Sequence, residues 1–137
     1  MRKSVVWYSQ RITDAIGDAK LSEYLRGFRF GNADISGDRN VPGPRYPAWI
    51  DSSLRISPAE QAEFFSRLVT KDLPVSADAM KQATALLEQH VSGGWTIRGK
   101  TGTSLPRDGS GRPDVSRGLG WYVGWAEKEG RVLAFAR

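Results

Sequence analysis

The chain of 137 residues carries 20 lysines and arginines against 15 aspartates and glutamates, a net charge of +5, and 39% of its residues are hydrophobic. This size and composition are typical of one globular domain. The basic residues are scattered from Arg2 to Arg137, whereas nucleic-acid-binding proteins gather them in a stripe or tail, so we expect no nucleic-acid partner. The absence of cysteine excludes disulfides and thiolate chemistry, and the single histidine, His90, excludes a multi-histidine metal site.

The sequence begins with predicted helices. The first begins with Ser4 as its N-cap, and a second covers residues 20–28. Gly31 and Asn32 tolerate a positive φ and are expected to end the second helix. No apolar run approaches the ~20 residues that span a bilayer, and the polar segment after Arg2 and Lys3 does not resemble a secretory signal.

The middle of the chain is predicted to be a long loop followed by helices. Residues 33–47 are rich in Gly, Pro, Asp and Asn, which is typical of a loop. Ser57, Pro58 and Glu60 then form the signature of a capped helix start, with proline at the first helical position. A further helix is predicted over residues 76–89, and this interpretation places His90 near a helix end.

The last third of the sequence has the pattern of β-strands. Residues 95–103 alternate in character, and residues 119–127 and 131–137 are two strands joined as a hairpin across a short polar turn. These strands are too apolar to stand alone, so they must pack on the helices. The predicted class is therefore α+β, with a helical region followed by antiparallel strands in a single domain over residues 1–137. Trp121 and Trp125, in the first strand of the hairpin, are expected in the core.

Lys100-Thr101-Gly102 is the sharpest candidate for a functional motif. On a strand at the edge of a cleft, the lysine supplies positive charge and the threonine hydroxyl can bind a carboxylate. The glycine lets a flat acyl substrate approach the backbone, and the N–H of Thr103 can stabilise an oxyanion. The alternative is that the tripeptide is only an exposed strand end, since three common residues recur by chance.

Other motifs in a fixed order favour the functional interpretation. These are Ser4-Val5-Val6, Phe30-Gly31-Asn32, Trp49, Lys100-Thr101-Gly102-Thr103, and Gly120-Trp121-Tyr122-Val123-Gly124-Trp125. In this order they resemble the S-x-V, Y-G-N, tryptophan and K-T-G elements of class D (oxacillinase-type) serine β-lactamases. The resemblance covers nearly the whole chain and implies part of the penicillin-binding, transpeptidase-like fold. Phe30 replaces the tyrosine of that pattern, so the contribution of a hydroxyl is in doubt there.

The resemblance implies a role for each matching residue. Ser4 would relay protons near the leaving nitrogen, and Val6 would line an apolar wall around a CO2-carboxylated lysine. Trp49 would donate its indole N–H to that carbamate. The substrate carboxylate would lie at Lys100 and Thr101, beside Gly102, with Thr103 in the oxyanion hole, whereas Phe30, Gly31 and Asn32 would form an active-site loop. Trp49 and Ser4 have plainer alternatives, a core aromatic and a helix cap.

The nucleophile of that family is absent from this sequence. No serine or threonine is followed three positions later by lysine; Ser4, for example, is followed by Trp7. We therefore expect an incomplete domain, whose S-x-x-K motif would precede Met1 and whose distal part would follow Arg137. The carboxylated lysine would be absent with that motif, and no other cofactor is expected. The intact protein would hydrolyse β-lactams in the bacterial periplasm, whereas this chain would be inactive and would dimerise through exposed strands.

Three alternatives to a fragment of an enzyme remain open. A β-lactam sensor domain has the same fold and acylates without turnover. A penicillin-binding transpeptidase would more often carry S-x-N than Ser4-Val5-Val6. A non-catalytic remnant would have a purely structural role.

Overall fold

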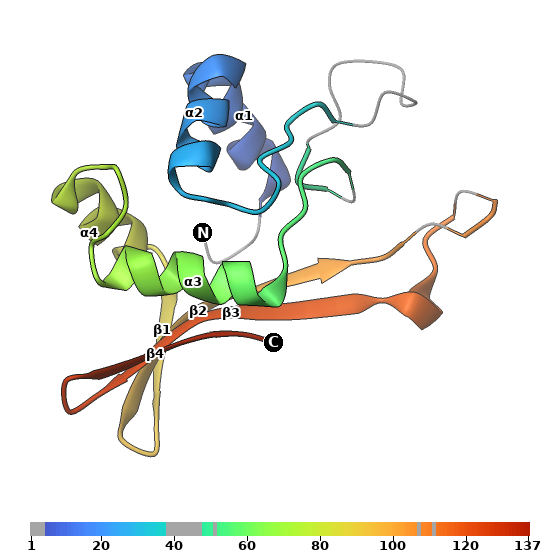
Figure 1. The fold of residues 1–137 in the computed structure, drawn as a ribbon. Coiled ribbons are helices and arrows are strands. Elements are labelled where there is room, and N and C mark those ends of the chain that lie inside the picture. Colours follow the sequence, from blue (N-terminus) through green and yellow to red (C-terminus); the bar gives the residue numbers. More distant parts are fainter. Residues whose placement is uncertain (1–4, 38–47, 51, 107, 111) are drawn as a thin grey trace.

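A computed structural model describes residues 5–37, 48–50, 52–106, 108–110 and 112–137 (Figure 1). Its elements in chain order are α1 (Val6–Ile16), α2 (Asp18–Gly27), α3 (Pro58–Val69), α4 (Ala77–Ala85), β1 (Glu88–Ser92), β2 (Trp95–Ser104), the short 3-10 helix η1 (Val115–Arg117), β3 (Leu119–Lys128) and β4 (Arg131–Ala136). The strands form one antiparallel sheet in the order β1-β2-β3-β4. The predicted α+β class is confirmed. The ten residues 38–47 of the predicted loop lie outside the described residues.

The prediction of one helix over residues 76–89 was wrong. Helix α4 ends at Ala85, and Glu88–Ser92 forms β1, which pairs with β2 from Glu88↔Gly99 to Ser92↔Trp95. The turn between them consists of Gly93 and Gly94, with φ of 56° and 77°. Two residues of positive φ are what a tight hairpin turn requires, so this glycine pair closes a hairpin and does not merely end a helix. His90 consequently lies exposed on a strand, opposite Ile97.

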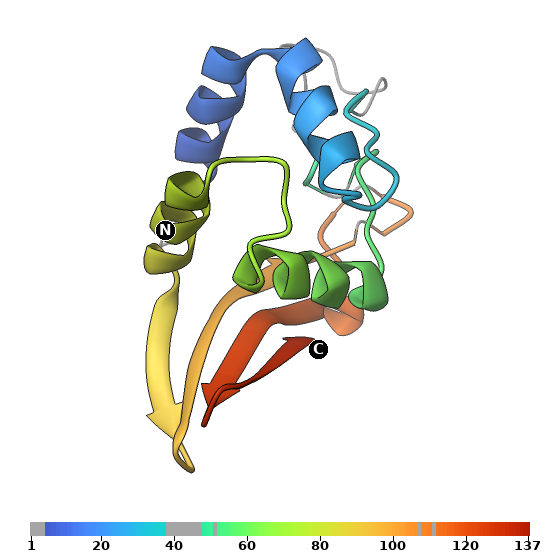
Figure 2. The same cartoon turned by 60° about the vertical axis from the view of Figure 1, so that its left-hand side comes forward.

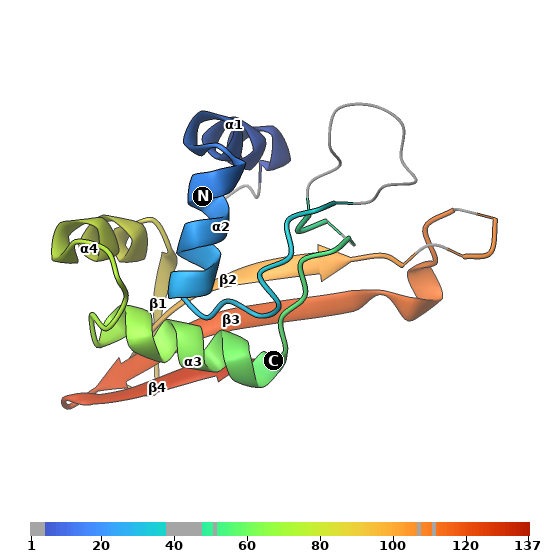
Figure 3. The same cartoon turned by 45° about the horizontal axis from the view of Figure 1, so that its top comes forward.

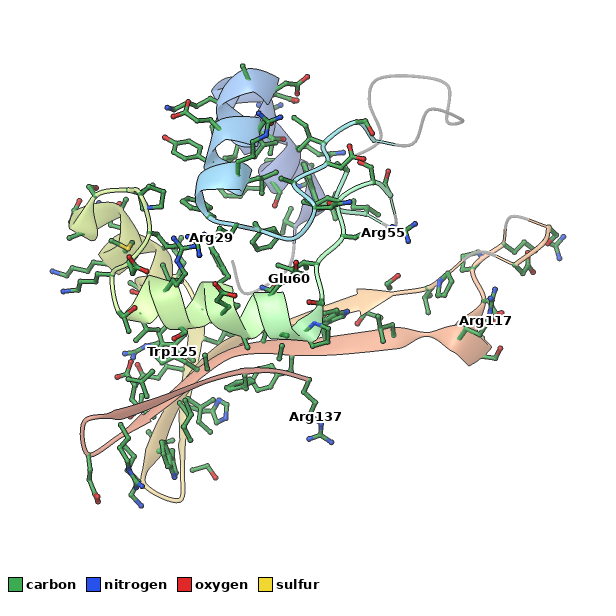
Figure 4. All side chains as sticks on the ribbon, viewed as in Figure 1. Arg29, Arg55, Glu60, Arg117, Trp125 and Arg137 are labelled. Atoms are coloured by element: carbon green, nitrogen blue, oxygen red, sulfur yellow. The ribbon has the colours of Figure 1, made fainter. Side chains whose placement is uncertain are left out.

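The core lies between α3 and the sheet. Phe65, Leu68, Leu73, Met80 and Trp125 are its buried members, and Trp125 is only 2% exposed. Figure 2 shows α3 lying over β3 and β4, and Figure 4 shows Trp125 directly beneath α3. The prediction that Trp125 belongs to the core is confirmed.

The capped start predicted for α3 is also confirmed. The Glu60 N–H donates to the Ser57 hydroxyl, and the Ser57 N–H donates to the Glu60 carboxylate at 2.8 Å. That backbone bond, with the bond from the Ser57 hydroxyl, holds the pKa of Glu60 below its ordinary value. Because the pKa of Glu60 is lowered in the folded state, its ionised carboxylate stabilises the fold at neutral pH. This stabilisation is lost as the pH falls through the folded-state pKa.

Replacing Ser57 with alanine should destabilise the chain by about 1 kcal/mol, because it removes the hydroxyl that accepts from the Glu60 N–H and donates to the Glu60 carboxylate, while the bond from the Ser57 backbone N–H remains. Ser66→Ala, on an exposed position of the same helix, is the matched control and should change the free energy of unfolding much less. Urea denaturation followed by circular dichroism measures both. Equal effects for the two variants would show that the cap does not stabilise α3.

Helices α1 and α2 form a hairpin on the same side of the sheet as α3 and α4 (Figure 3). Gly17 separates them with a φ of 78°. Val5 occupies the N-cap position of α1, so the helix begins one residue later than predicted, and Ser4 lies outside the described residues. No residue of α1 is buried, and Trp7 and Tyr8 are 61% and 54% exposed. Helix α1 therefore presents apolar and aromatic side chains that the described part of the chain does not cover.

Candidate active site

Strand β2 extends beyond its pairing with β1, and the K-T-G motif lies on this extension. Pairing with β1 stops at Gly99, whereas pairing with β3 continues from Lys100↔Val123 to Ser104↔Leu119. Among the described residues, this stretch of β2 thus has a neighbouring strand on one side only. Its open edge offers backbone N–H and C=O groups to an extended or planar ligand.

A cavity of about 850 Å³ lies at this edge. It is lined by residues from segments far apart in the sequence: Val5, Val6, Trp7, Tyr8, Ser9, Trp49, Ile50, Ala85, Leu86, Lys100, Thr101, Gly102 and Thr103. The predicted site residues Val6, Trp49 and Lys100 to Thr103 therefore meet around one space, as expected for a shared site. The volume lies in the range of small-molecule pockets.

The charge of the cavity wall comes from Lys100. The Lys100 ammonium donates to the Thr101 carbonyl at 2.6 Å and lies 3.5 Å from the Thr101 hydroxyl. No acidic side chain is present among the described residues that line this cavity. A cation and a hydroxyl on an otherwise mainly apolar wall favour an anionic ligand with an apolar body.

Trp49 is not a core aromatic. It is 37% exposed and lines this cavity together with a second one of about 490 Å³, in which Thr103 and Trp121 also take part. Trp121 is half-buried and belongs to that second wall, so the expectation of a core position is wrong for Trp121. Trp49 therefore divides two adjoining cavities beside the open strand edge.

The segment Phe30-Gly31-Asn32 does not line the cavity, contrary to the prediction of an active-site loop. The Phe30 ring packs edge-to-face on Phe64, with 5.1 Å between ring centroids. Gly31 has a φ of 54° and lies against the backbone of Arg55, and the Asn32 amide is hydrogen-bonded to the backbone of Ser53 and Arg55. These residues were predicted to belong to the site because their motif occurs in the expected order along the sequence. Motif order alone does not show whether a residue lines a cavity or packs behind the residues that do.

Several lining residues were missed by the sequence analysis, namely Trp7, Tyr8, Ile50 and Leu86. Trp7 and Leu86 are 61% and 53% exposed. Trp7 falls outside the apolar stripe that Tyr8 shares with Ile12 and Ile16, and this position is the signal that could have indicated a second contact surface.

The described residues contain no group of three or more His, Asp or Glu side chains arranged to hold a metal ion. None of the helices in the described ranges combines the length and the apolar character that crossing a bilayer requires.

Comparison with known proteins identifies the family of this chain. Residues 1–137 match the family described as the penicillin-binding protein transpeptidase domain. The chain belongs to that family. It is 44% identical over 135 residues to beta-lactamase OXA-9 of Klebsiella pneumoniae, which covers 98% of this chain and 49% of the relative.

Solved structures lead to the same subgroup. The crystal structure of the class D β-lactamase OXA-427 superimposes with a TM-score of 0.82 at 44% identity, over 97% of this chain and 55% of that one. The regulatory protein BlaR1 of Bacillus licheniformis is 29% identical over 136 residues, which is 99% of this chain and 20% of that protein. The resemblance to class D β-lactamases is thus confirmed, and the chain spans about half the length of the β-lactamases it matches.

Proposed function

We propose that this chain forms the substrate-facing wall of a serine β-lactamase that hydrolyses β-lactams through an acyl-enzyme. The observation that carries the proposal is the single cavity in which Val6, Trp49 and Lys100 to Thr103 meet at an open strand edge. A penicillin presents a strained lactam carbonyl and a carboxylate on a largely apolar body. The strand edge, the Lys100 cation and the cavity wall without acidic groups suit those features.

The proposed roles follow the chemistry of each group. Lys100 and the Thr101 hydroxyl would bind the carboxylate, Gly102 would leave room for the ring, and the Thr103 N–H would donate to the oxyanion that develops when the lactam carbonyl is attacked. Ser4 would relay the proton to the leaving nitrogen. Trp49 would donate its indole N–H to a carboxylated lysine that acts as the base, with Val6 on the apolar side of that group.

The nucleophile and that lysine are proposed to lie outside the 137 residues, because no serine or threonine in the sequence has lysine at the third position after it. The 137-residue chain should therefore show no hydrolysis of nitrocefin, whereas a protein extended to the full length of its relatives should hydrolyse it. Absorbance of the opened chromophore measures both. Turnover by the purified chain, at a rate that rises with its concentration and survives repeated purification, would contradict the proposed division of the site.

A β-lactam sensor is the second candidate, favoured by the similarity to BlaR1 along 99% of this chain. The two functions differ in deacylation. A hydrolase releases its acyl group and turns over, whereas a sensor keeps it. The lifetime of the acyl adduct in the full-length protein, followed by intact mass spectrometry, separates the two.

We further propose that the enzyme works in the bacterial periplasm. A separate proposal is that the 137-residue chain alone self-associates through its sheet. The outer strands β1 and β4 carry exposed apolar side chains, including Val91 at 68% and Leu133 at 57%. Uncovered edges of this kind pair with other chains. Light scattering should therefore give a mass above 15.1 kDa, and a monodisperse monomer would contradict the proposal.

A further inference from the structure

Two segments distant in sequence are joined by hydrogen bonds behind Trp49. The Asn32 N–H donates to the Arg55 carbonyl at 3.0 Å, and the Arg55 N–H donates to Asn32 Oδ1 at 3.0 Å. The Asn32 side-chain Nδ2 also donates to the Ser53 carbonyl at 2.9 Å. A side chain that donates and accepts at once is needed for this pattern, and the asparagine amide provides both groups.

Ser53 strengthens the same junction. Its hydroxyl donates to the Asp34 carbonyl at 2.9 Å and accepts from the Gly37 N–H at 2.9 Å. Asn32 Oδ1 accepts a further bond from the Asp34 N–H at 3.2 Å. The segment 53–55 is thus fixed along its length by the segment 32–37.

The segment 53–55 in turn holds the residue that precedes Trp49. The Leu54 N–H donates to the Ala48 carbonyl at 2.9 Å. Ala48 is 5% exposed and so is fixed by its surroundings as well, whereas Trp49, the next residue, projects to the cavity wall. A continuous set of bonds therefore runs from Asn32 through Arg55 and Leu54 to the backbone beside Trp49.

Gly31 permits the close approach on which these bonds depend. A Cβ atom at Gly31 would lie 1.9 Å from the Arg55 carbonyl oxygen and 2.8 Å from its carbon. Both are backbone atoms that cannot move aside without moving the segment 53–55. Gly17 also has a positive φ, 78° against 54° at Gly31, but a Cβ there would meet no atom within 4 Å.

We infer that Asn32 is a positioning residue for Trp49: with Gly31, it sets the place of the indole on the cavity wall without contacting the ligand. Figure 4 shows Arg55, one anchor of this junction, on the segment that leads into α3. The claim that Asn32 positions Trp49 does not depend on the proposed function. The claim that this positioning affects catalysis rests on the proposed function. The two are therefore tested separately.

The structural test is fluorine NMR of the full-length protein labelled with 5-fluorotryptophan, in which Trp49→Phe identifies the Trp49 resonance. Asn32→Ala should shift or broaden that resonance and leave that of the buried Trp125 unchanged. Asn32→Asp keeps the acceptor for the Arg55 N–H but loses the donor to Ser53, so it should have a smaller effect. An unchanged Trp49 resonance in folded Asn32→Ala, or in folded Asn32→Asp if the alanine variant does not fold, would overturn the inference.

A matched glycine pair gives a second test by the same readout. Gly31→Ala and Gly17→Ala both place a Cβ on a backbone of positive φ, but only Gly31→Ala collides with Arg55. Gly31→Ala should displace the Trp49 resonance and Gly17→Ala should not. Equal displacement by both variants would assign the effect to general destabilisation and would overturn the inference.

The catalytic test is a double-mutant cycle on kcat for a penicillin. A misplaced Trp49 should lower kcat on the order of 10- to 100-fold in Asn32→Ala. In the Trp49→Phe background, Asn32→Ala should cause little further loss, because the group that it positions is already gone. Losses that multiply in the double variant would overturn the inference. If the protein has no activity on β-lactams, the proposed function fails while the NMR comparison still decides the positioning role.

Discussion

Trp125→Ala should destabilise the chain by about 3–5 kcal/mol, the range for removing a large buried aromatic side chain. Trp125 is 2% exposed, packs on Phe65 with 6.1 Å between ring centroids, and its indole N–H donates to Glu127. Its removal leaves a cavity between α3 and the sheet and takes one hydrogen bond from the Glu127 carboxylate, which keeps its ion pair with Arg98. Because single domains of this size have marginal stability, much of the folded population should be lost.

The measurement is urea unfolding followed by circular dichroism, with Trp7→Ala as the control. Trp7 has the same side chain but is 61% exposed, so its removal should cost far less. Trp125→Phe should fall between the two, since it keeps most of the volume and loses the bond to Glu127. A loss in Trp125→Ala no larger than in Trp7→Ala would contradict the position of the core between α3 and the sheet.

Lys100→Ala should lower kcat/KM for a penicillin on the order of 100- to 1,000-fold in the full-length protein, the range for losing one preorganised electrostatic contact to the reacting substrate. Lys100 carries the only charge among the described residues lining the cavity, and its ammonium lies beside the Thr101 carbonyl and hydroxyl. Without it, the substrate carboxylate would face a mainly apolar wall that carries hydroxyl groups but no cation.

Lys81→Ala is the control for overall charge, because Lys81 is an exposed lysine of α4 that does not line this cavity. It should leave kcat/KM nearly unchanged. Steady-state kinetics at two salt concentrations adds a second criterion, since the variant that lacks Lys100 should lose part of the salt dependence. Equal kinetics for the two lysine variants would remove Lys100 from the site.

The parts of the fold that could be predicted are those fixed by local chemistry. The capped start of α3 depends on Ser57, Pro58 and Glu60, which act within one helical turn, and the β3–β4 hairpin depends on an alternating pattern. Strand β1 was missed because its structure is not fixed by local chemistry. Its residues carry no strong strand pattern, and the pairing with β2 supplies the bonds that decide between helix and strand.

Site residues with distinctive chemistry could be predicted from the sequence. Residues that position other residues were harder to predict. Val6, Trp49 and Lys100 to Thr103 were predicted to share a site, and the cavity brings them together. Asn32 was assigned to an active-site loop, but its amide is used up by the backbone of Ser53 and Arg55. That difference depends on which backbone atoms fold against it, and no spacing in the sequence contains this information.

The central claim is that this chain supplies the wall of a β-lactam site whose nucleophile lies elsewhere in the protein. The most direct measurement is acylation of the full-length protein by a slowly hydrolysed β-lactam, quenched with acid and mapped by peptide mass spectrometry. The account predicts one adduct, on a serine outside residues 1–137 that is followed three positions later by lysine, and much less of it in Lys100→Ala. An adduct on a serine within these 137 residues would contradict the account.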